Sequence, residues 1–452
     1  MNFDDTIAAI ATPLGEGGLA VLRVSGPDAL PIADKIFDGR NRPSEASSHT
    51  VHFGKIVRDG RTIDEVLLAV LRAPRTFTRE DTVEISCHGG ILPAKLILDA
   101  ILERGARAAE PGEFTRRAFL NGRIDLTQAE AVADLIHSRT ELALAAANEQ
   151  LAGQLSRRIN RLRDDLLHIL AHVEAHIDFP DEDIAPDTRE QLLKRLEDGI
   201  AFIAQLLHTA NEGQILRRGI RAAILGRPNS GKSSLLNQLL GRDRAIVSPI
   251  PGTTRDTIEE TANVRGLPVV FIDTAGLREA RDEIEIEGIR RSRQSLAQAE
   301  LILHVLDASQ PLTNDDHIYF TELAGKKRVL VRNKIDLPIQ CQLPADLAPA
   351  VDVSCVTGQG VESLKDAIKS MVWSGEIKAE MLQVMINSRH QDALNRARAA
   401  ALRTVEALRD NATLELVALD LRISVAAVGE IVGKTTTEDL LDSIFSQFCI
   451  GK

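Results

Sequence analysis

Aromatic residues are scarce in this chain of 452 residues: they make up 3% of it, with one Trp and one Tyr. A platform of interleaved aromatic side chains that stacks on bases is therefore not expected. Basic residues are outnumbered too, because 54 Lys and Arg stand against 65 Asp and Glu, for a net charge of −11. A general, charge-driven coat for nucleic acid is therefore not expected, and any RNA contact must be local or shared with a partner.

Cysteines are few, and long apolar runs are missing. The four cysteines form no C-x-x-C pair, which leaves a structural zinc site without support. Four thiols in a long chain fit a reducing cytosol, so we expect a cytoplasmic protein. No apolar run approaches the ~18 residues that span a bilayer, and the first residues, MNFDD, are acidic where a signal peptide is basic. We expect no membrane segment.

The overall composition is that of an ordinary globular protein. Charged residues make up 26% and hydrophobic residues 44%. These values exclude a wholly disordered, collagen-like or disulfide-scaffold chain. At roughly 150 residues per domain, the length suggests about three domains.

Residues 1–118 alternate strand-like segments with turns. Short apolar runs at 19–24, 51–57, 65–71 and 81–86 predict strands, and Arg58-Asp59-Gly60 predicts a hairpin turn. The last strand leads through Cys87-His88-Gly89-Gly90 into a helical stretch at 91–102. We predict a small α+β domain here.

Helical periodicity fills 119–215 and returns over 376–452. Apolar residues at steps of three and four predict long helices with one continuous apolar face, which we interpret as the core of a bundle or a dimer seam. The members of this pattern in the first segment are Leu151, Leu155, Ile159, Leu162, Leu166, Ile169, Val173, Ile177, Leu192, Leu196, Ile200, Ile203 and Leu207. The last helix is marked by Leu440, Leu441, Ile444, Phe445 and Phe448.

Residues 216–375 alternate apolar strands with helices. The runs at 220–225, 269–272, 301–306, 329–331 and 351–353 are short and mostly apolar, as buried parallel strands are. The simplest topology is an α/β domain inserted into a helical bundle whose two halves flank it in sequence.

The segment from Gly226 to Ser233, GRPNSGKS, matches the phosphate-binding pattern G-x-x-x-x-G-K-[ST]. It follows a predicted strand and opens a predicted helix, which is the context that this motif requires. Its glycines let backbone amides face the phosphates, and the amino end of the helix adds positive potential. Lys232 would reach the terminal phosphates, and the Ser233 hydroxyl would bind Mg²⁺.

Two further segments favour GTP over ATP. Asp273-Thr274-Ala275-Gly276 follows one predicted strand, and Asn333-Lys334-Ile335-Asp336 follows another. The carboxylate of Asp336 can accept two donors from the N1–N2 edge of guanine, which adenine lacks. Ser354-Cys355-Val356 stands where Ras-type GTPases have Ser-Ala-Lys, so the Ser fits and the Val departs. These ordered segments resemble a Ras-type GTPase.

The predicted nucleotide contacts lie in these segments and in the loop around Gly252-Thr253-Thr254. Thr254 is the expected switch residue, closing on Mg²⁺ and the γ-phosphate. Leu277 stands where Ras-like enzymes place a catalytic Gln, so another group must orient water and offset charge. The contacts are Asn229, Ser230, Gly231, Lys232, Ser233, Ser234, Ser248, Thr253, Thr254, Asp273, Thr274, Ala275, Gly276, Asn333, Lys334, Asp336, Ser354, Cys355 and Val356.

The whole chain resembles the MnmE (TrmE) family of tRNA-modification GTPases. Beside the nucleotide motifs, the resemblance rests on PGEFT at 111–115, RAFLN at 117–121, QAEA at 128–131, DFPDE at 178–182 and FCIGK at 448–452. It implies a cytoplasmic homodimer that works with an FAD-containing partner, MnmG. Together they would install an aminomethyl or carboxymethylaminomethyl group on C5 of the wobble uridine of tRNA. The one-carbon unit would come from a tetrahydrofolate derivative, 5-formyl or 5,10-methylene.

The resemblance also implies roles for particular residues. K⁺ would replace the missing positive charge, held by Asn229 and the loop of Ser248, Ile250 and Thr253, and Glu285 would orient water. Cys449 matches the family's C-terminal cysteine; a chemical role and simple buried packing both stay open. The residues that match the folate contacts of the N-terminal domain are Arg23, Glu80, Arg123 and Lys452.

Two other functions compete with this one. A regulatory GTPase switch could recruit an RNA or ribosome-assembly partner without taking part in modification chemistry. A folate-dependent transferase with a regulatory G domain is the other alternative. It overlaps the tRNA-modification function, and only a product assay separates the two.

Overall fold

The computed structural model describes residues 4–178, 189–241, 259–272, 298–344, 347, 349–373, 379–410 and 412–452. Contacts divide the chain into two compact units, which are taken one at a time. Unit 1 comprises Met1–Ala133, Ser156–Ala171 and Leu421–Lys452, and unit 2 comprises Asp134–Leu155 and His172–Asp420. None of the described helices is long and apolar enough to cross a membrane.

Unit 1 is built around a seven-stranded sheet of order β3-β4-β5-β6-β2-β1-β7. Only the pairing of β1 with β7 is parallel. The sequence predicted β2, β4, β5 and β6 but not the other three strands. Their bounds are β1 (Ile7–Ile10), β2 (Gly17–Ser25), β3 (Phe37–Gly39), β4 (Thr50–Arg58), β5 (Arg61–Leu71), β6 (Thr82–Gly89) and β7 (Arg107–Ala108).

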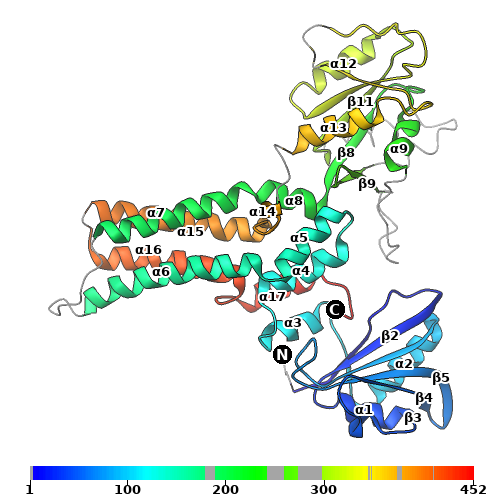
Figure 1. Cartoon of the computed structure of the whole chain (residues 1–452), viewed down its shortest axis with the longest axis vertical. Helices are drawn as coiled ribbons and strands as arrows, with labels where there is room; N and C mark the ends of the chain where they lie inside the picture. Colours follow the sequence, from blue (N-terminus) through cyan, green and yellow to red (C-terminus); the bar gives the residue numbers. More distant parts are fainter. Residues whose placement is uncertain are drawn as a thin grey trace. The chain divides into compact units, whose positions relative to one another are not determined.

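One face of this sheet is covered and the other is open along β4 and β5. On β5, buried Val66, Leu68 and Val70 alternate with more exposed neighbours, as the two-residue period of a strand requires. Helices α1 (Ala29–Ile36) and α2 (Ile91–Glu103) contribute to the same core (Figure 1). On the opposite face, Phe53 and Leu67 are paired across the strands and are 66% and 48% exposed.

The end of the chain packs against the helices that follow this sheet. Helices α3 (Glu113–Leu120), α4 (Leu126–His137) and α17 (Glu438–Phe445) belong to this region. Leu126 and Ala129 share a buried cluster with Ile444, Phe445 and Phe448. Phe448 is part of the packing as predicted, although α17 itself ends at Phe445.

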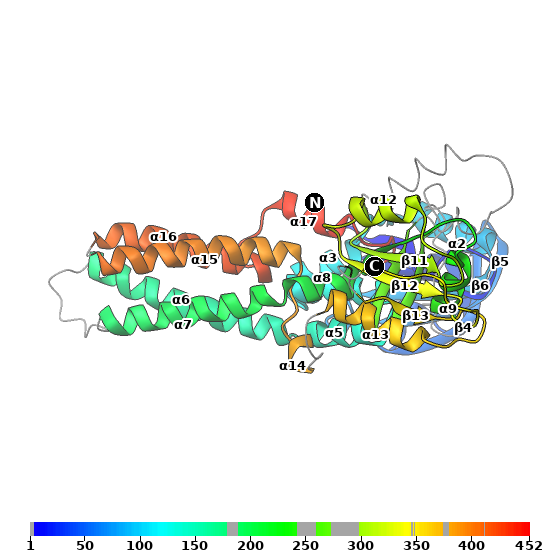
Figure 2. The same cartoon turned by 90° about the horizontal axis from the view of Figure 1, so that it is seen from above.

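The helices of unit 2 confirm the predicted long-helix pattern. Helices α7 (Arg189–His208) and α15 (Ser388–Arg409) pack side by side, although a whole α/β domain separates them in sequence (Figure 2). Helices α6 (Gln154–Asp178) and α16 (Leu414–Val432) contribute to both units. The shorter helices are α5 (Glu141–Leu151), α8 (Ala210–Arg218) and α14 (Ala379–Leu382).

The inserted domain, called the G domain below, has a six-stranded sheet of order β13-β12-β11-β8-β10-β9. All neighbours are parallel except β9 with β10. The strands are β8 (Ile220–Leu225), β9 (Glu260–Val264), β10 (Leu267–Phe271), β11 (Leu301–Asp307), β12 (Arg328–Asn333) and β13 (Val351–Val353). The five predicted parallel strands are confirmed, whereas antiparallel β9 was missed.

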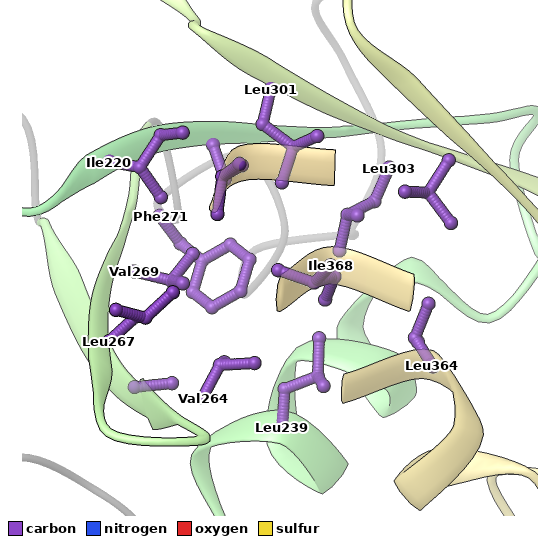
Figure 3. Close-up of a cluster of buried hydrophobic side chains, with 14 of the residues drawn as sticks. Ile220, Leu239, Val264, Leu267, Val269, Phe271, Leu301, Leu303, Leu364 and Ile368 are labelled. Carbon is purple, nitrogen blue, oxygen red and sulfur yellow. The ribbon is translucent and has the colours of Figure 1, made fainter. Parts of the chain in front are cut away.

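Both faces of the G-domain sheet are covered. Leu301 and Leu303 of β11 point into one core, which helices α9 (Lys232–Leu240) and α13 (Val361–Val372) close with residues such as Leu239 and Ile368 (Figure 3). Leu306 of the same strand packs on the other face, against Phe320 of α12 (Asn314–Glu322). Burial on both faces explains why these strands read as continuous apolar runs.

Candidate functional site

The segment GRPNSGKS lies between β8 and α9, at the carboxyl edge of the parallel sheet. Two of its glycines have backbone angles that other residues rarely adopt, with φ of 156° at Gly226 and 94° at Gly231. A Cβ atom on Gly226 would lie 2.2 Å from the Val305 carbonyl oxygen, and one on Gly231 would lie 2.1 Å from Asn333 Nδ2. Both positions therefore require glycine.

Lys232 is held over this loop. Its Nζ donates to the carbonyl oxygens of Gly226 at 2.9 Å and Arg227 at 2.8 Å. Burial lowers the pKa of its ammonium group. The Ser230 hydroxyl is buried and finds no hydrogen-bond partner among the described residues. A buried cation and a buried unpartnered hydroxyl in one loop suit an anionic ligand such as a phosphate.

The predicted base-reading segments meet the phosphate loop through Asn333. This residue is 2% exposed; its Nδ2 donates to the Ser230 carbonyl oxygen at 2.9 Å, and its Oδ1 accepts from the Cys355 amide at 3.2 Å. One side chain thus ties three loops together. Asn229, next to Ser230, has a left-handed backbone with φ of 61° and is exposed.

Asp336 is oriented by Ser354, whose hydroxyl donates to Asp336 Oδ1 at 2.6 Å. Ser354 is fully buried, whereas Val356 is 83% exposed. The side chain at the position where this chain departs from the Ser-Ala-Lys pattern therefore makes little contact with the protein. The predicted residues on this side of the site thus lie together.

Lys334 contacts a residue that the sequence analysis did not single out. Its Nζ lies 2.6 Å from Asp307 Oδ2 at the end of β11. Burial alone would raise the pKa of Asp307, but the hydrogen bonds from Lys334 and Ser309 outweigh it, and the pKa is lowered. This pair fastens the base-reading segment to the neighbouring strand.

Ser233 and Ser234 open α9, with Ser233 half-buried and Ser234 exposed. Ser233, the residue predicted to bind Mg²⁺, thus lies in the first turn of α9. The remaining predictions for the G domain lie outside the described residues: Ser248, Ile250, Thr253, Thr254, Asp273, Thr274, Ala275, Gly276 and Glu285.

A further ion pair supports the phosphate loop and was not predicted. Arg227 Nε lies 3.2 Å from Asp316 Oδ2, and Asp316 is fully buried at the start of α12. The same carboxylate accepts from the backbone and hydroxyl of Thr313, which forms a capping box. The pattern Thr-x-x-Asp signals such a cap in the sequence, but it does not reveal the Arg227 contact.

The four residues predicted for folate all fall in unit 1, and three already have partners in the chain. Arg23 Nε donates to Glu84 at 2.8 Å, and its Nη1 donates to the Gly451 carbonyl oxygen at 3.3 Å, next to Lys452. Arg123 donates to the Thr76 carbonyl oxygen and lies 5.3 Å from the ring centroid of Phe77. Lys452 is half-exposed.

Glu80 belongs to a buried ionic network that the sequence analysis missed. Its Oε1 accepts from Arg117 Nη1 at 3.1 Å, and its Oε2 accepts from Ser25 at 2.7 Å. Arg117 is 2% exposed and also contacts Asp5 and Glu113. Burial raises the pKa of each of these last two carboxyls, but their arginine partners outweigh it and lower both pKa values.

Cys449 is exposed in the described chain, so the interpretation of it as a buried packing thiol was wrong. The reason is that α17 ends at Phe445 and Phe448 occupies the apolar cluster, which turns the next side chain outward. Cys87 and Cys341 are the buried thiols. Burial raises the pKa of both, and it raises that of Cys355 to about 11.

Comparison with known proteins extends the match beyond the G domain. Residues 126–449 match the MnmE helical domain, and residues 6–123 match the GTP-binding protein TrmE N-terminus. The tRNA modification GTPase MnmE of Listeria innocua is 48% identical over 458 residues, and that of Geobacter metallireducens is 47% identical over 459, with all of each chain covered. A solved structure of Era from Aquifex aeolicus is 27% identical over 40% of this chain and 66% of its own, with a TM-score of 0.26.

A phosphate loop at the carboxyl edge of a parallel sheet, followed by the base-reading segment, defines a P-loop GTPase domain. Here that domain is flanked by an α+β domain and long helices. With full-length identity of 48% and both flanking regions matched, the chain belongs to the tRNA modification GTPase MnmE family.

Proposed function

We propose that this chain, a GTP hydrolase of a tRNA-modifying family, acts with the FAD-containing partner MnmG on the wobble uridine of tRNA. The pair installs an aminomethyl or carboxymethylaminomethyl group at C5, and a tetrahydrofolate derivative supplies the one-carbon unit. The observation that carries the proposal is the full-length match to MnmE relatives, which includes the N-terminal domain as well as the GTPase. A GTPase switch alone would not need that first domain.

In the G domain, each predicted site residue that the structure describes would help to hold GTP. Lys232 would exchange its two carbonyl partners for phosphate oxygens, and the buried Ser230 hydroxyl, which has no partner among the described residues, would pair with the same group. Asp336, oriented by Ser354, accepts from the guanine edge. Ser233 with Thr254 would hold Mg²⁺, which neutralises phosphate charge when bound.

The hydrolytic step needs a positive charge and an oriented water, which Leu277 does not provide. We assign the charge to K⁺ held by Asn229 with Ser248, Ile250 and Thr253, and the water to Glu285. Asn229 suits the first role, because this residue of the phosphate loop is exposed and its side chain carries a hard amide oxygen.

Hydrolysis rates in KCl and NaCl at equal ionic strength test this assignment. We expect faster hydrolysis in K⁺, and Asn229→Ala should lose most of the difference because an ion ligand is gone. Glu285→Ala should instead slow hydrolysis while keeping the preference for K⁺. Equal wild-type rates in the two salts would rule out the cation role.

Folate would bind near the end of the chain, where Arg23 reaches the carbonyl oxygen of Gly451 beside Lys452. Arg123 and Lys452 bring positive charge for a folate carboxylate, and Glu80 brings an acceptor for ring N–H groups. Glu80 is held by Arg117 and Ser25, which would fix its direction before the ligand arrives. The exposed thiol of Cys449 lies in the same terminal segment and can take part in chemistry.

The open sheet face of unit 1 supports a homodimer. Val51, Phe53 and Leu67 of β4 and β5 expose 62%, 66% and 48% of their surface, and water contact with such a patch is unfavourable. A second copy would cover it. Phe53→Glu should convert dimers to monomers in sedimentation, whereas Ile318→Glu, at an apolar residue of α12 that is 53% exposed, should not.

The function itself is tested by mass spectrometry of the wobble nucleoside in cells that lack this protein. The modified uridine should disappear, return with the wild-type gene, and stay absent with Lys232→Ala. An immunoblot should show the Lys232→Ala variant at the same level as the wild-type protein, which separates loss of function from loss of protein. Normal modification in the deleted cells would refute the proposal.

A further inference from the structure

A cavity in unit 2 lies at the edge of the G-domain sheet opposite the phosphate loop. It measures about 460 Å³, within the size range of small-molecule sites. Its wall includes Ile220, the first residue of β8, with Glu300 and Lys327, which directly precede β11 and β12. The phosphate loop follows the other end of β8, so the cavity and the nucleotide site occupy opposite ends of the same strands.

Two buried polar groups in this wall lack partners. Glu212 of α8 is 7% exposed and Trp373, at the end of α13, is 2% exposed. Glu212 Oε2 and Trp373 Nε1 make no hydrogen bond to any described residue. A buried acceptor and a buried donor left unpaired each cost free energy, and both line the same space. This points to an occupant that pairs with both.

The charges around the cavity indicate the chemistry of that occupant. Arg218 and Glu300 pair with each other, Nη2 to Oε1 at 2.6 Å. Glu212 then remains as an anion and Lys327 as a cation, each without an ion pair in the described part of the chain. A ligand with one positive and one negative group complements this arrangement.

Apolar side chains complete the wall. Ile215, Ile220 and Met371 line the cavity beside the polar groups. They would favour a ligand that carries a hydrocarbon part as well as its two charges.

We propose that this cavity binds a small zwitterion of the α-amino-acid class with an apolar side chain. Its ammonium group donates to Glu212, and its carboxylate accepts from Trp373 Nε1 and lies near Lys327. Its hydrocarbon part packs against Ile215, Ile220 and Met371. The site is separate from the nucleotide and folate sites proposed above.

Isothermal titration of the full-length protein with L-leucine tests the proposal, at concentrations up to about 10 mM. Two matched compounds each lack one charge: 3-methylbutylamine has no carboxylate, and 4-methylpentanoate has no ammonium group. We expect L-leucine to bind at least about tenfold more tightly than either, because each loses a charge-assisted hydrogen bond. Binding of none of the three, or equal binding of all three, would overturn the proposal and leave a cavity that holds water.

Two variants locate the binding. Glu212→Gln should weaken L-leucine binding about tenfold or more, and Trp373→Phe, which removes the N–H and keeps the ring, should weaken it several-fold. Glu190→Gln, the same change at an exposed residue of α7, should leave binding unchanged. Affinity for a fluorescent GDP analogue reports whether each variant is folded. Leucine binding that persists unchanged in both cavity variants would place it elsewhere and refute this site.

Discussion

The two sheets of this protein differ in how they bury their apolar side chains. The G-domain sheet is mostly parallel and covered on both faces, and its parallel strands are mostly apolar. Figure 3 shows the core on one of these faces. The sheet of unit 1 is mostly antiparallel, with helices on one face and exposed apolar residues on the other. The first completes its core within the chain, whereas the second leaves apolar side chains exposed on one face. The buried polar groups of the two units differ as well. Single hydrogen bonds from Asn333 and Ser354 join the loops of the G domain, whereas a buried ionic network around Arg117 supports unit 1.

The largest effect is expected where that ionic network is broken. Arg117→Ala would leave Glu80 without its arginine, whereas Asp5 and Glu113 would keep Arg107 as a partner. Removing one partner of a buried pair costs about 3–5 kcal/mol. Scanning calorimetry should show unit 1 unfolding at a lower temperature, while GDP-analogue affinity is kept. Arg104→Ala, at an exposed arginine, is the control. Unchanged unfolding in Arg117→Ala would show that the network adds no stability.

A change in the phosphate loop should instead impair nucleotide binding by the G domain and leave unit 1 intact. Gly231→Ala would force a Cβ to within 2.1 Å of Asn333 Nδ2 at a backbone φ of 94°. Asn333 could only yield by releasing Ser230 and Cys355, so we expect GTP affinity to fall by about a hundredfold or more. Gly325→Ala has open space around it and should bind normally, as a fluorescent nucleotide titration can show. Equal affinity of both variants would contradict the role of Asn333 as the link.

A smaller and more specific effect is expected at the base reader. In Asp336→Asn the amide oxygen can still accept from Ser354, which leaves the NH₂ group facing the base. GTP affinity should fall about tenfold to a hundredfold, and xanthine nucleotides should now bind, because their O2 accepts where guanine donates. Competition titrations with GTP and XTP measure both. A variant with unchanged GDP affinity would remove Asp336 from the guanine site.

The smallest effect is a difference in acid sensitivity. The lowered pKa values of Asp5 and Glu113 mean that these carboxylates stabilise the folded state when ionised. That stability is complete above their unfolded values of 3.8 and 4.5 and is lost as the pH falls through the lower folded values. Below about pH 4.5, unit 1 should lose stability, and Glu113→Gln should flatten this dependence. Calorimetry at several pH values gives the test, and a variant as acid-sensitive as the wild type would disprove the link.

Periodicity predicted most elements because burial imposes it. The five parallel strands were found as apolar runs, and the long helices were found by their three- and four-residue spacing. Strand β9 was missed because it reads ETANV, and its Glu260 and Thr261 are buried polar residues that no apolar pattern marks. β1, β3 and β7 were missed because β1 reads IAAI and β3 reads FDG, in which Ala, Asp and Gly are poor strand formers, and β7 has only two residues.

Local sequence motifs were enough to predict the parts of the nucleotide site whose function depends on backbone geometry. The phosphate loop is determined by its own glycines and by Lys232, since loop geometry and one cation make up that chemistry. The sequence by itself thus determined the class of nucleotide site, the order of the domains and the family. Only the tertiary structure decided that Asn333 joins three loops, that Arg227 pairs with Asp316, that Arg117 anchors Glu80, and that Cys449 faces outward. These contacts join residues far apart in the chain, and no local pattern encodes which distant partner a side chain meets.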